Sequence, residues 1–365
     1  MFSTLMQRVQ DQFTKELPFV VYRKPERNEV KGVFQHTATL HLIADLTTSG
    51  FVFAPFDNSS KPVLILRDEL VIATDFVASK VQSKRELSHD VSQKEIYKLL
   101  VQKAIAEIEN KKFEKVVLSR KIDLDISVNA PELFQRLLST YESAFCYLWY
   151  HPKVGLWLGA TPEILLRSDN KQFTTMALAG TQALKGEAIP SWGEKELQEQ
   201  VLVTNYIKVA LKDKVSGLRA SPLETVRAGN LLHLRTKLSG RMLCQLDEII
   251  SGLHPTPAVC GMPMPAARDF ILANENYERE YYTGFLGELN FKEERQRTSR
   301  RKNQEDQAYK VIKNKSELFV NLRCMKLAKK VATIYVGGGI TSGSESEKEW
   351  QETVNKSETI LKILS

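Results

Sequence analysis

The sequence predicts an α+β fold with large, mostly antiparallel β-sheets. Short apolar runs typical of strands come in groups along the chain and do not alternate strictly with helices. Three longer segments, at residues 92–112, 196–215 and 346–364, are typical of helices. No Gly/Ser-rich linker or long repeat divides the 365 residues, so we expect one domain over 1–365.

The first 90 residues begin with a helix and continue with strands. Residues 1–16 place Leu5, Val9 and Phe13 four apart, which is typical of an amphipathic helix. The apolar runs that follow are bounded by turn residues, and they predict strands at 17–22, 38–44, 51–56 and 62–67.

The segment 92–112 carries the clearest helical pattern. Ser92 and Glu95 have the spacing of a capping box at its start. Its predicted apolar face consists of Ile96, Leu99, Leu100, Ala104 and Ile108.

Strands predominate after this helix, interrupted by a short helix at 130–138. The predicted strands are 115–124, 144–150, 155–160, 163–167, 233–242, 283–291, 318–327 and 330–340.

Composition limits the class of protein. Apolar residues make up 42% and charged residues 26%, as in ordinary globular domains. No run approaches the ~18 apolar residues of a membrane helix, and the N-terminus lacks the apolar core of a secretory signal. The four cysteines are scattered, which argues against a zinc site or a disulfide framework and favours small core residues in a reducing, cytoplasmic protein: Cys146, Cys244, Cys260 and Cys324.

The net charge of +7 comes partly from a basic run at 291–303. Such a run can mark a nucleic-acid surface. It contains acids and has no interleaved aromatic residues, so we interpret it as a solvated loop between strands and expect neither nucleic acid nor a membrane as partner. The alternative is a non-enzymatic anion- or RNA-binding protein, for which binding should depend steeply on salt.

Two acidic segments are nearly alike, EKELQEQ at 194–200 and EKEWQET at 347–353. They place Glu196 with Glu199, and Glu349 with Glu352, on one face of a helix each, because residues three apart are helical neighbours. Two explanations remain open from the residues. The carboxylates can be a solvated helix start, where they suit the helix dipole, or the two faces can converge on a divalent cation such as Mg²⁺.

Two further segments have the composition of ligand-binding loops. YVGGGIT places Gly337, Gly338 and Gly339 at the end of a strand, where backbone can approach a ligand closely, but it is neither a dinucleotide fingerprint nor a P-loop. HPTPAVCGMP, at 254–263, predicts a rigid loop because its prolines fix the backbone. His254 on this loop is either a structural histidine or a group held for a substrate.

Several motifs follow one another in a recognisable order. They are FEKVVLSR, GATPEILLR, LAGT, KELQEQ, HPTPAVCG, EYYTGFLGE, LFVNLRC and YVGGGIT with EKEWQETVNK. As an ordered set, from about Phe113 to the C-terminus, they resemble the chorismate-utilising enzymes, which include isochorismate, salicylate, anthranilate and aminodeoxychorismate synthases. The resemblance implies two large antiparallel sheets packed together with helices outside. It also implies a single chorismate-binding domain over 1–365, with a variable part at 1–90 and a catalytic core at 91–365.

The resemblance also assigns roles to individual residues. Glu199 and Glu352 would hold Mg²⁺, with Glu196 and Glu349 in support. Lys115 would be the general base and Glu163 the general acid, although a strand lysine commonly points to solvent. The acid role requires a raised pKa, which a partly apolar pocket favours. The implied substrate contacts are Gly180, Thr181, His254, Thr256, Tyr282, Arg323, Gly337, Gly339 and Lys356.

Two positions bear on which reaction is implied. Lys115 stands where ammonia-using relatives carry glutamine, and Ala179 stands where aminodeoxychorismate synthases of one type carry a nucleophilic lysine. The resemblance therefore implies isochorismate synthase, an isomerase that adds water at C2 of chorismate and removes the C4 hydroxyl, for menaquinone or siderophore synthesis. Salicylate synthase stays open as an alternative, and an ammonia-using synthase subunit is less favoured. We expect no obligate protein partner.

Overall fold

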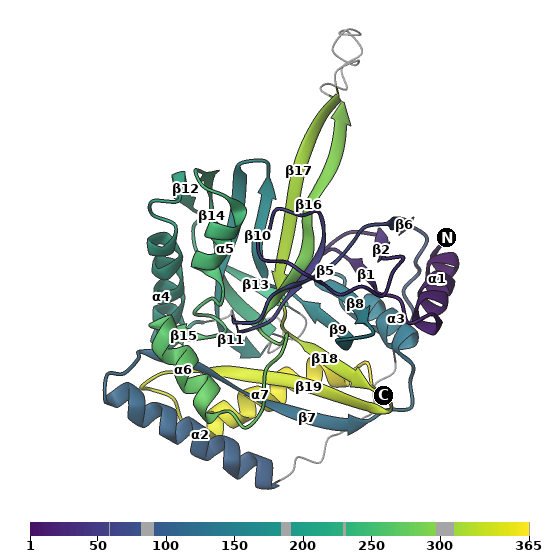
Figure 1. The fold of residues 1–365 in the computed structure, drawn as a ribbon. Helices are drawn as coiled ribbons and strands as arrows, with labels where there is room; N and C mark the ends of the chain where they lie inside the picture. The colour runs from purple at the N-terminus through teal and green to yellow at the C-terminus, as the bar shows by residue number, and fades with distance from the viewer. Residues whose placement is uncertain (58, 82–90, 184–190, 229–230, 297–309, 365) are drawn as a thin grey trace.

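Two large sheets form the centre of the protein (Figure 1). The computed structural model describes residues 1–365 except 58, 82–90, 184–190, 229–230, 297–309 and 365. The first sheet has the order β15 (Gly261–Met262), β7 (Lys115–Asp125), β19 (Val331–Ile340), β18 (Cys324–Ala328), β9 (Gly155–Thr161), β8 (Phe145–His151), β1 (Phe19–Arg23), β2 (Val30–Phe34) and β6 (Glu69–Ala73).

The second sheet is larger by one strand. Its order is β12 (Val215–Ala220), β14 (Leu231–Met242), β11 (Gln172–Ala183), β10 (Ile164–Asp169), β17 (Lys310–Val320), β16 (Phe285–Gln296), β4 (Gly50–Ala54), β5 (Val63–Ile65) and β3 (His41–Leu42), and β13 (Glu224–Ala228) also pairs with β14. All strand pairs in both sheets are antiparallel within the described residues. The predicted α+β class with antiparallel sheets is confirmed.

The helices lie around the sheets (Figure 1). Helices α1 (Phe2–Thr14) and α3 (Ala130–Thr140) cover the outer face of the first sheet, and α4 (Glu194–Ala210) and α5 (Leu246–Leu253) cover that of the second. Helices α2 (Val91–Glu109), α6 (Met264–Asn274) and α7 (Ser346–Leu361) pack near β7 and β19. Within the described residues, no helix combines the length and the apolar character that a membrane span requires.

Aromatic side chains fill the space between the two sheets. The rings of Phe145 and Phe319, from opposite sheets, stack with their centroids 4.2 Å apart. Tyr22 and Phe51 are a second such pair, at 5.1 Å. Each pair of this kind adds about 0.5–1.5 kcal/mol beyond the burial of its area, so the aromatic layer joins the sheets into one body.

Two of the places where the chain passes from one sheet to the other are neighbours in space. One crossing, Pro162–Glu163, joins β9 to β10, and the other, Asn321–Arg323, joins β17 to β18. Backbone hydrogen bonds tie them together, from the Val320 N–H to the Glu163 carbonyl at 3.0 Å and from the Ala160 N–H to the Arg323 carbonyl at 3.1 Å. Glu163 and Arg323 are therefore held side by side between the sheets.

The second crossing corrects a prediction, because 318–327 is two strands and not one. Asn321 is buried, accepts a hydrogen bond from the Tyr147 hydroxyl at 2.6 Å and donates one to the Tyr281 carbonyl at 2.9 Å. Arg323 has φ +48°, a left-handed conformation that ends a strand. The apolar run continues on both sides, so its composition does not reveal the break.

Helix α2 confirms the predicted helix at 92–112, and Ala104 and Ile108 of its predicted apolar face are buried, but the buried face is rotated from the predicted one. Its buried residues are Tyr97, Val101, Ala104 and Ile108, whereas Ile96 and Leu99 are 55% and 64% exposed. The helix already includes Ser92, since it begins at Val91, so Ser92 is not its cap. The rotation follows from packing against Trp350 of α7, whose ring lies 6.1 Å from that of Tyr97.

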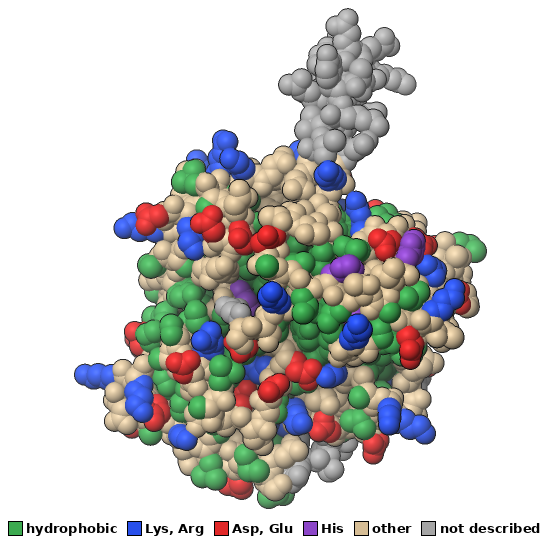
Figure 2. All heavy atoms as spheres, viewed as in Figure 1, with side chains coloured by type: hydrophobic (Ala, Val, Ile, Leu, Met, Phe, Trp, Pro, Cys, Tyr) green, Lys and Arg blue, Asp and Glu red, His purple; other side chains and the backbone are tan. Residues whose placement is uncertain are grey.

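Other segments differ from the sequence predictions in smaller ways. The elements that were not predicted are β2, β6, β11, β12, β13, β15, α5 and α6. Part of the basic run, 291–296, belongs to β16, while 297–303 lies outside the described residues. All four cysteines are free, and Cys244 is only half-buried. The face of the molecule in Figure 2 mixes acidic and basic side chains and shows no extended patch of one sign.

The first 90 residues are an integral part of both sheets. Strands β1, β2 and β6 belong to the first sheet, and β3, β4 and β5 belong to the second. This segment therefore supplies much of the interface between the sheets, including Tyr22 and Phe51.

A buried carboxylate also joins the two sheets. Glu288 of β16 accepts a hydrogen bond from the Tyr22 hydroxyl and one from Lys24 Nζ, each at 2.6 Å. Lys24 also pairs with Glu317 of β17 at 2.7 Å. The Glu288 side chain is 6% exposed, so its charge depends on these partners and not on water.

Replacing Glu288 with glutamine is expected to lower the free energy of unfolding by about 3 kcal/mol, because it removes the buried carboxylate that pairs with both Lys24 and Lys31 and accepts from the Tyr22 hydroxyl. Urea unfolding followed by tryptophan fluorescence measures the change. Glu293→Gln in the same strand is the matched control, because this side chain is 44% exposed and should contribute less than about 0.5 kcal/mol. Equal effects of the two substitutions would contradict the proposed contribution of Glu288 to the joining of the two sheets.

Candidate active site

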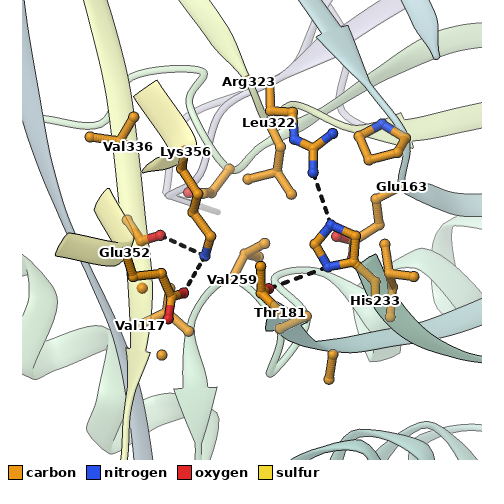
Figure 3. A pocket seen from close by; sticks show the side chains of 18 of the residues that line it. Val117, Glu163, Thr181, His233, Val259, Leu322, Arg323, Val336, Glu352 and Lys356 are labelled. Carbon is orange, nitrogen blue, oxygen red and sulfur yellow. Dashed lines mark hydrogen bonds and ion pairs between the residues drawn. The ribbon is translucent and has the colours of Figure 1, made fainter. Parts of the chain in front are cut away.

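A cavity opens where the two crossings approach β19 and α7 (Figure 3). Most of the residues implied by the sequence line it. They are Glu163, Gly180, Thr181, Glu196, Glu199, Tyr282, Arg323, Gly337, Gly339, Glu352 and Lys356. Segments far apart in the sequence thus supply one polar chamber.

Lys115 lies behind the cavity wall at the start of β7. Its side chain is 1% exposed, and its Nζ donates a hydrogen bond to Glu199 Oε1 at 2.6 Å. The alternative of a solvent-exposed strand lysine is therefore wrong. A buried ammonium is costly without a charged partner, and Glu199 supplies that partner.

Glu163 occupies the first crossing, buried and facing the cavity. Burial raises the pKa of its carboxyl to about 7, although Lys115, Arg323 and Lys356 each act to lower it. A carboxyl with this pKa still carries its proton in a good part of the molecules near neutral pH, as a general acid requires.

Arg323 is oriented by a histidine that the sequence analysis did not single out. Its Nη2 donates to His233 Nε2 at 2.9 Å, and His233 Nδ1 in turn lies 3.0 Å from the Gly180 carbonyl (Figure 3). Burial, with help from Arg323 and Lys356, lowers the pKa of His233 to about 3. The imidazole is therefore neutral, with its proton on Nδ1. A polar residue between the buried Leu232 and Leu234 was the signal for it in the sequence.

Lys356 approaches the cavity from α7. Its Nζ pairs with Glu352 Oε1 at 2.7 Å, one helical turn away, and donates to the Gly337 carbonyl at 3.0 Å. Tyr282 closes another side, with its ring stacked on Tyr335 at 5.3 Å. A Cβ added to Gly337 would lie 3.1 Å from the Tyr282 hydroxyl, so a side chain there would crowd the cavity.

The glycines of β19 leave room between the acidic side chains. A Cβ on Gly338 would lie 3.4 Å from Glu349 Oε2 and 3.5 Å from Glu352 Oε1. A Cβ on Gly339 would lie 3.4 Å from Glu199 Oε1. The two acidic segments thus face consecutive glycines of one strand, close enough that a Cβ at either glycine would be in van der Waals contact with a carboxylate oxygen.

The donor set at this position fits Mg²⁺. Among the described residues, no three acidic, histidine or cysteine side chains stand close enough to form a ready-made metal cluster. Magnesium commonly takes only one or two protein carboxylates and keeps water or substrate oxygens for the rest. Glu199 and Glu352, on two sides of one cavity, match that requirement.

His254 and Thr256 are not among the residues that line the cavity, and neither are Lys115 and Glu349. His254 is buried, its Nε2 lies 3.1 Å from the Pro55 carbonyl, and its ring packs edge-on against Phe285. Burial lowers the pKa of His254 to about 4. The loop reaches the cavity through Val259 instead, and His254 holds its base in place.

The cavity brings together the acid Glu163 and the cations Arg323 and Lys356, with the amine of Lys115 behind its wall. Such a set of groups is typical of an acid–base site for a small anionic ligand. The sequence matches the description "chorismate binding enzyme" over residues 65–295 and again over 310–362. The chain belongs to the chorismate-binding enzyme family.

Individual relatives agree with this assignment. The chain is 29% identical to isochorismate synthase EntC of Escherichia coli (strain K12), over 73% of this chain and 66% of the relative. It is 31% identical to isochorismate synthase MenF of the same organism, over 73% of this chain and 58% of the relative. The matched part thus spans less than two thirds of these two proteins. A solved structure of DhbC from Bacillus anthracis superposes with a TM-score of 0.76 at 23% identity, covering 96% of both chains.

Proposed function

We propose that this protein is an isochorismate synthase, which converts chorismate to isochorismate. The observation that carries the proposal is that Glu163 lines the cavity with a carboxyl pKa of about 7, while Lys115 lies behind its wall and pairs with Glu199, which does line it. The similarity to EntC and MenF, both named isochorismate synthases, supports it.

In the proposed reaction, Lys115 first gives up the proton with which it pairs with Glu199, and the neutral amine then accepts a proton from the water that bonds to C2 of the ring. Glu163 donates a proton to the C4 hydroxyl, which leaves as water, so atoms and charges balance. Arg323 is fixed by His233 and can present its remaining N–H groups to a carboxylate of the substrate, a role that suits the planar guanidinium. Tyr282 and Lys356 also line the cavity, where they can supply a hydroxyl group and a second positive charge for the substrate.

We further propose that the enzyme uses Mg²⁺, held by Glu199 and Glu352 with Glu196 and Glu349 in support. The ion, when bound, would neutralise a ring carboxylate of the substrate. The protein's own contribution is the placement of two acidic helix faces against the glycines of β19. We propose that the enzyme acts alone, in the cytoplasm, on a free small molecule.

Incubation of the purified protein with chorismate and Mg²⁺, followed by chromatography of the products, tests the proposal. Isochorismate should accumulate without ammonia or any added protein. Accumulation of salicylate and pyruvate would assign the protein to the salicylate-forming branch. Turnover only with ammonia would assign it to the amine-forming branch, and no turnover would reject the proposed function.

The rate should depend on the protonation of Glu163. Because the carboxyl must carry a proton to act as the acid, kcat/KM is expected to fall as pH rises through about 7 in an enzyme whose Lys115 is already neutral, approaching a tenfold loss per pH unit. The groups that oppose its raised pKa are Lys115 on β7, Arg323 at the crossing and Lys356 on α7. Steady-state rates across this range, with circular dichroism to verify the fold, measure the effect. A kcat/KM that stays constant or rises above pH 7 would contradict this role.

A further inference from the structure

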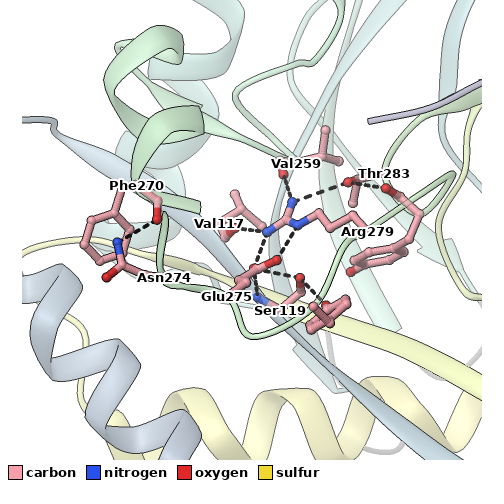
Figure 4. A network of polar contacts seen from close by, with 10 residues as sticks. Val117, Ser119, Val259, Phe270, Asn274, Glu275, Arg279 and Thr283 are labelled. Atoms are coloured by element: carbon pink, nitrogen blue, oxygen red, sulfur yellow. Dashed lines mark hydrogen bonds and ion pairs between the residues drawn. The ribbon is translucent and has the colours of Figure 1, made fainter. Parts of the chain in front are cut away.

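A second buried ion pair lies directly behind the cavity wall (Figure 4). Arg279 contacts both carboxylate oxygens of Glu275, with Nε at 2.8 Å from Oε2 and Nη2 at 2.5 Å from Oε1. Both side chains are 2% exposed. Neither lines the cavity, and the reaction described above uses neither of them.

The remaining donors of Arg279 reach residues that do line the cavity. Nη2 donates to the Val117 carbonyl at 2.7 Å, and Nη1 donates to the Val259 carbonyl at 3.0 Å. Nη1 also lies 3.3 Å from the Thr283 hydroxyl. Val117, Val259 and Thr283 come from three different segments of the chain, and all three form part of the cavity wall.

Glu275 extends the network to β7. Its Oε1 accepts hydrogen bonds from the Ser119 backbone N–H and from the Ser119 hydroxyl, each at 2.8 Å. The Ser119 hydroxyl also lies 2.7 Å from the Tyr277 hydroxyl. The carboxylate and the guanidinium therefore hold β7 at two positions, Val117 and Ser119.

The hydrogen bonds of Arg279 and Glu275 lie close in sequence to Lys115, the proposed base, and to Tyr282, a proposed substrate contact. Lys115 lies two residues before Val117 on β7, and its backbone pairs with Met262 of β15, just after the loop that contains Val259. The Tyr282 N–H donates to the Arg279 carbonyl at 2.8 Å. A shift of the ion pair would therefore change the position of the amine and of the tyrosine relative to each other.

We propose that Glu275 and Arg279 act as a positioning pair, which holds the strand of the base, the adjoining loop and the turn of Tyr282 in one arrangement for the reaction. This inference rests on the proposed function. The planar guanidinium is suited to the task because its five donors point in fixed directions. A lysine in the same place has the charge but cannot serve the same acceptors.

Arg279→Lys is expected to lower kcat for chorismate by ~30- to 100-fold, as a small misplacement of reacting groups does, while KM changes by less than about threefold. Ser119→Ala removes one donor to Glu275 and keeps the ion pair, and it should lower kcat roughly fivefold. Rates are expressed per folded molecule, with the folded fraction taken from circular dichroism. Ser119→Ala decides the question if Arg279→Lys does not fold.

Glu288→Gln is the matched control, since it also removes a buried, bonded carboxylate but lies away from the cavity. It should reduce stability with kcat unchanged. If kcat per folded molecule stays within about twofold of wild type in the Arg279 and Ser119 variants, or falls equally in the control, the positioning role is overturned. The wild-type assay is read first, because its failure rejects the proposed function, whereas an active wild type with unaffected variants rejects only the pair.

Discussion

Replacing Lys115 with glutamine is expected to lower the rate of isochorismate formation by ~10³-fold, within the range that a general base contributes. Glutamine has similar length and can still donate a hydrogen bond to Glu199, so the local packing should survive. It cannot accept a proton from water. The structure places the amine 2.6 Å from Glu199 and buries it almost completely, so bulk solvent offers no ready substitute.

The same substitution at Lys112 provides the control. This lysine precedes β7 by three residues, is 63% exposed and pairs with Glu107 at 2.5 Å. Lys112→Gln should leave kcat within about twofold, since exposed ion pairs contribute little. Chromatographic product assays at saturating chorismate measure both variants. A Lys115→Gln enzyme that retains a tenth or more of the wild-type rate would exclude the amine as the base.

Replacing Glu199 or Glu352 with alanine is expected to reduce turnover by about 10³-fold or more with the fold intact, because each change removes a proposed direct ligand of Mg²⁺. The Glu352 side chain is 32% exposed and its partner Lys356 is 24% exposed, so Glu352→Ala should shift the melting temperature little. Glu199→Ala should lower the melting temperature, because it leaves the buried Lys115 ammonium without its charged partner, so its rate is expressed per folded molecule. Excess Mg²⁺ should not restore the rate at concentrations that saturate the wild type.

Glu358→Ala is the matched control for this pair, because Glu358 is an exposed acid on the same helix, α7. Its activity and its dependence on Mg²⁺ should equal those of the wild type. Calorimetric titration of Mg²⁺ gives a readout besides turnover, with binding to the wild type weakened in both acidic-site variants. Unchanged metal affinity in Glu199→Ala and Glu352→Ala would remove these residues from the metal site.

The general architecture could be predicted from local pattern. Grouped apolar runs predicted antiparallel strands, and the helix at 92–112 was correct because its signal is long and periodic. The predicted buried face of that helix was right at Ala104 and Ile108 but wrong at Ile96 and Leu99. The rotation of the helix depends on packing against Trp350, more than 200 positions away. Long-range packing of this kind leaves no local trace in the sequence.

For the site, too, residues in distinctive local motifs could be predicted, whereas residues placed by long-range packing could not. Residues in distinctive motifs, such as Glu163 and Glu352, do line the cavity. His254 stood out because of its proline-rich loop, yet it binds the Pro55 carbonyl, whereas His233 lies in an unremarkable strand and holds Arg323. Which histidine reaches the cavity is decided by how the two sheets are joined, and neither spacing nor residue type specifies that.

The paired crossings have a consequence for how the molecule tolerates motion. The Glu163 carbonyl accepts a hydrogen bond from Val320 at the end of β17, and the Arg323 carbonyl accepts one from Ala160 of β9. A movement of one sheet relative to the other should therefore move both residues together. As a result, the distance between Glu163, the proposed proton donor, and Arg323, the proposed ligand of a substrate carboxylate, should change little when the aromatic layer fluctuates. Substitutions that loosen the aromatic layer should therefore lower the melting temperature before they change the relative position of Glu163 and Arg323.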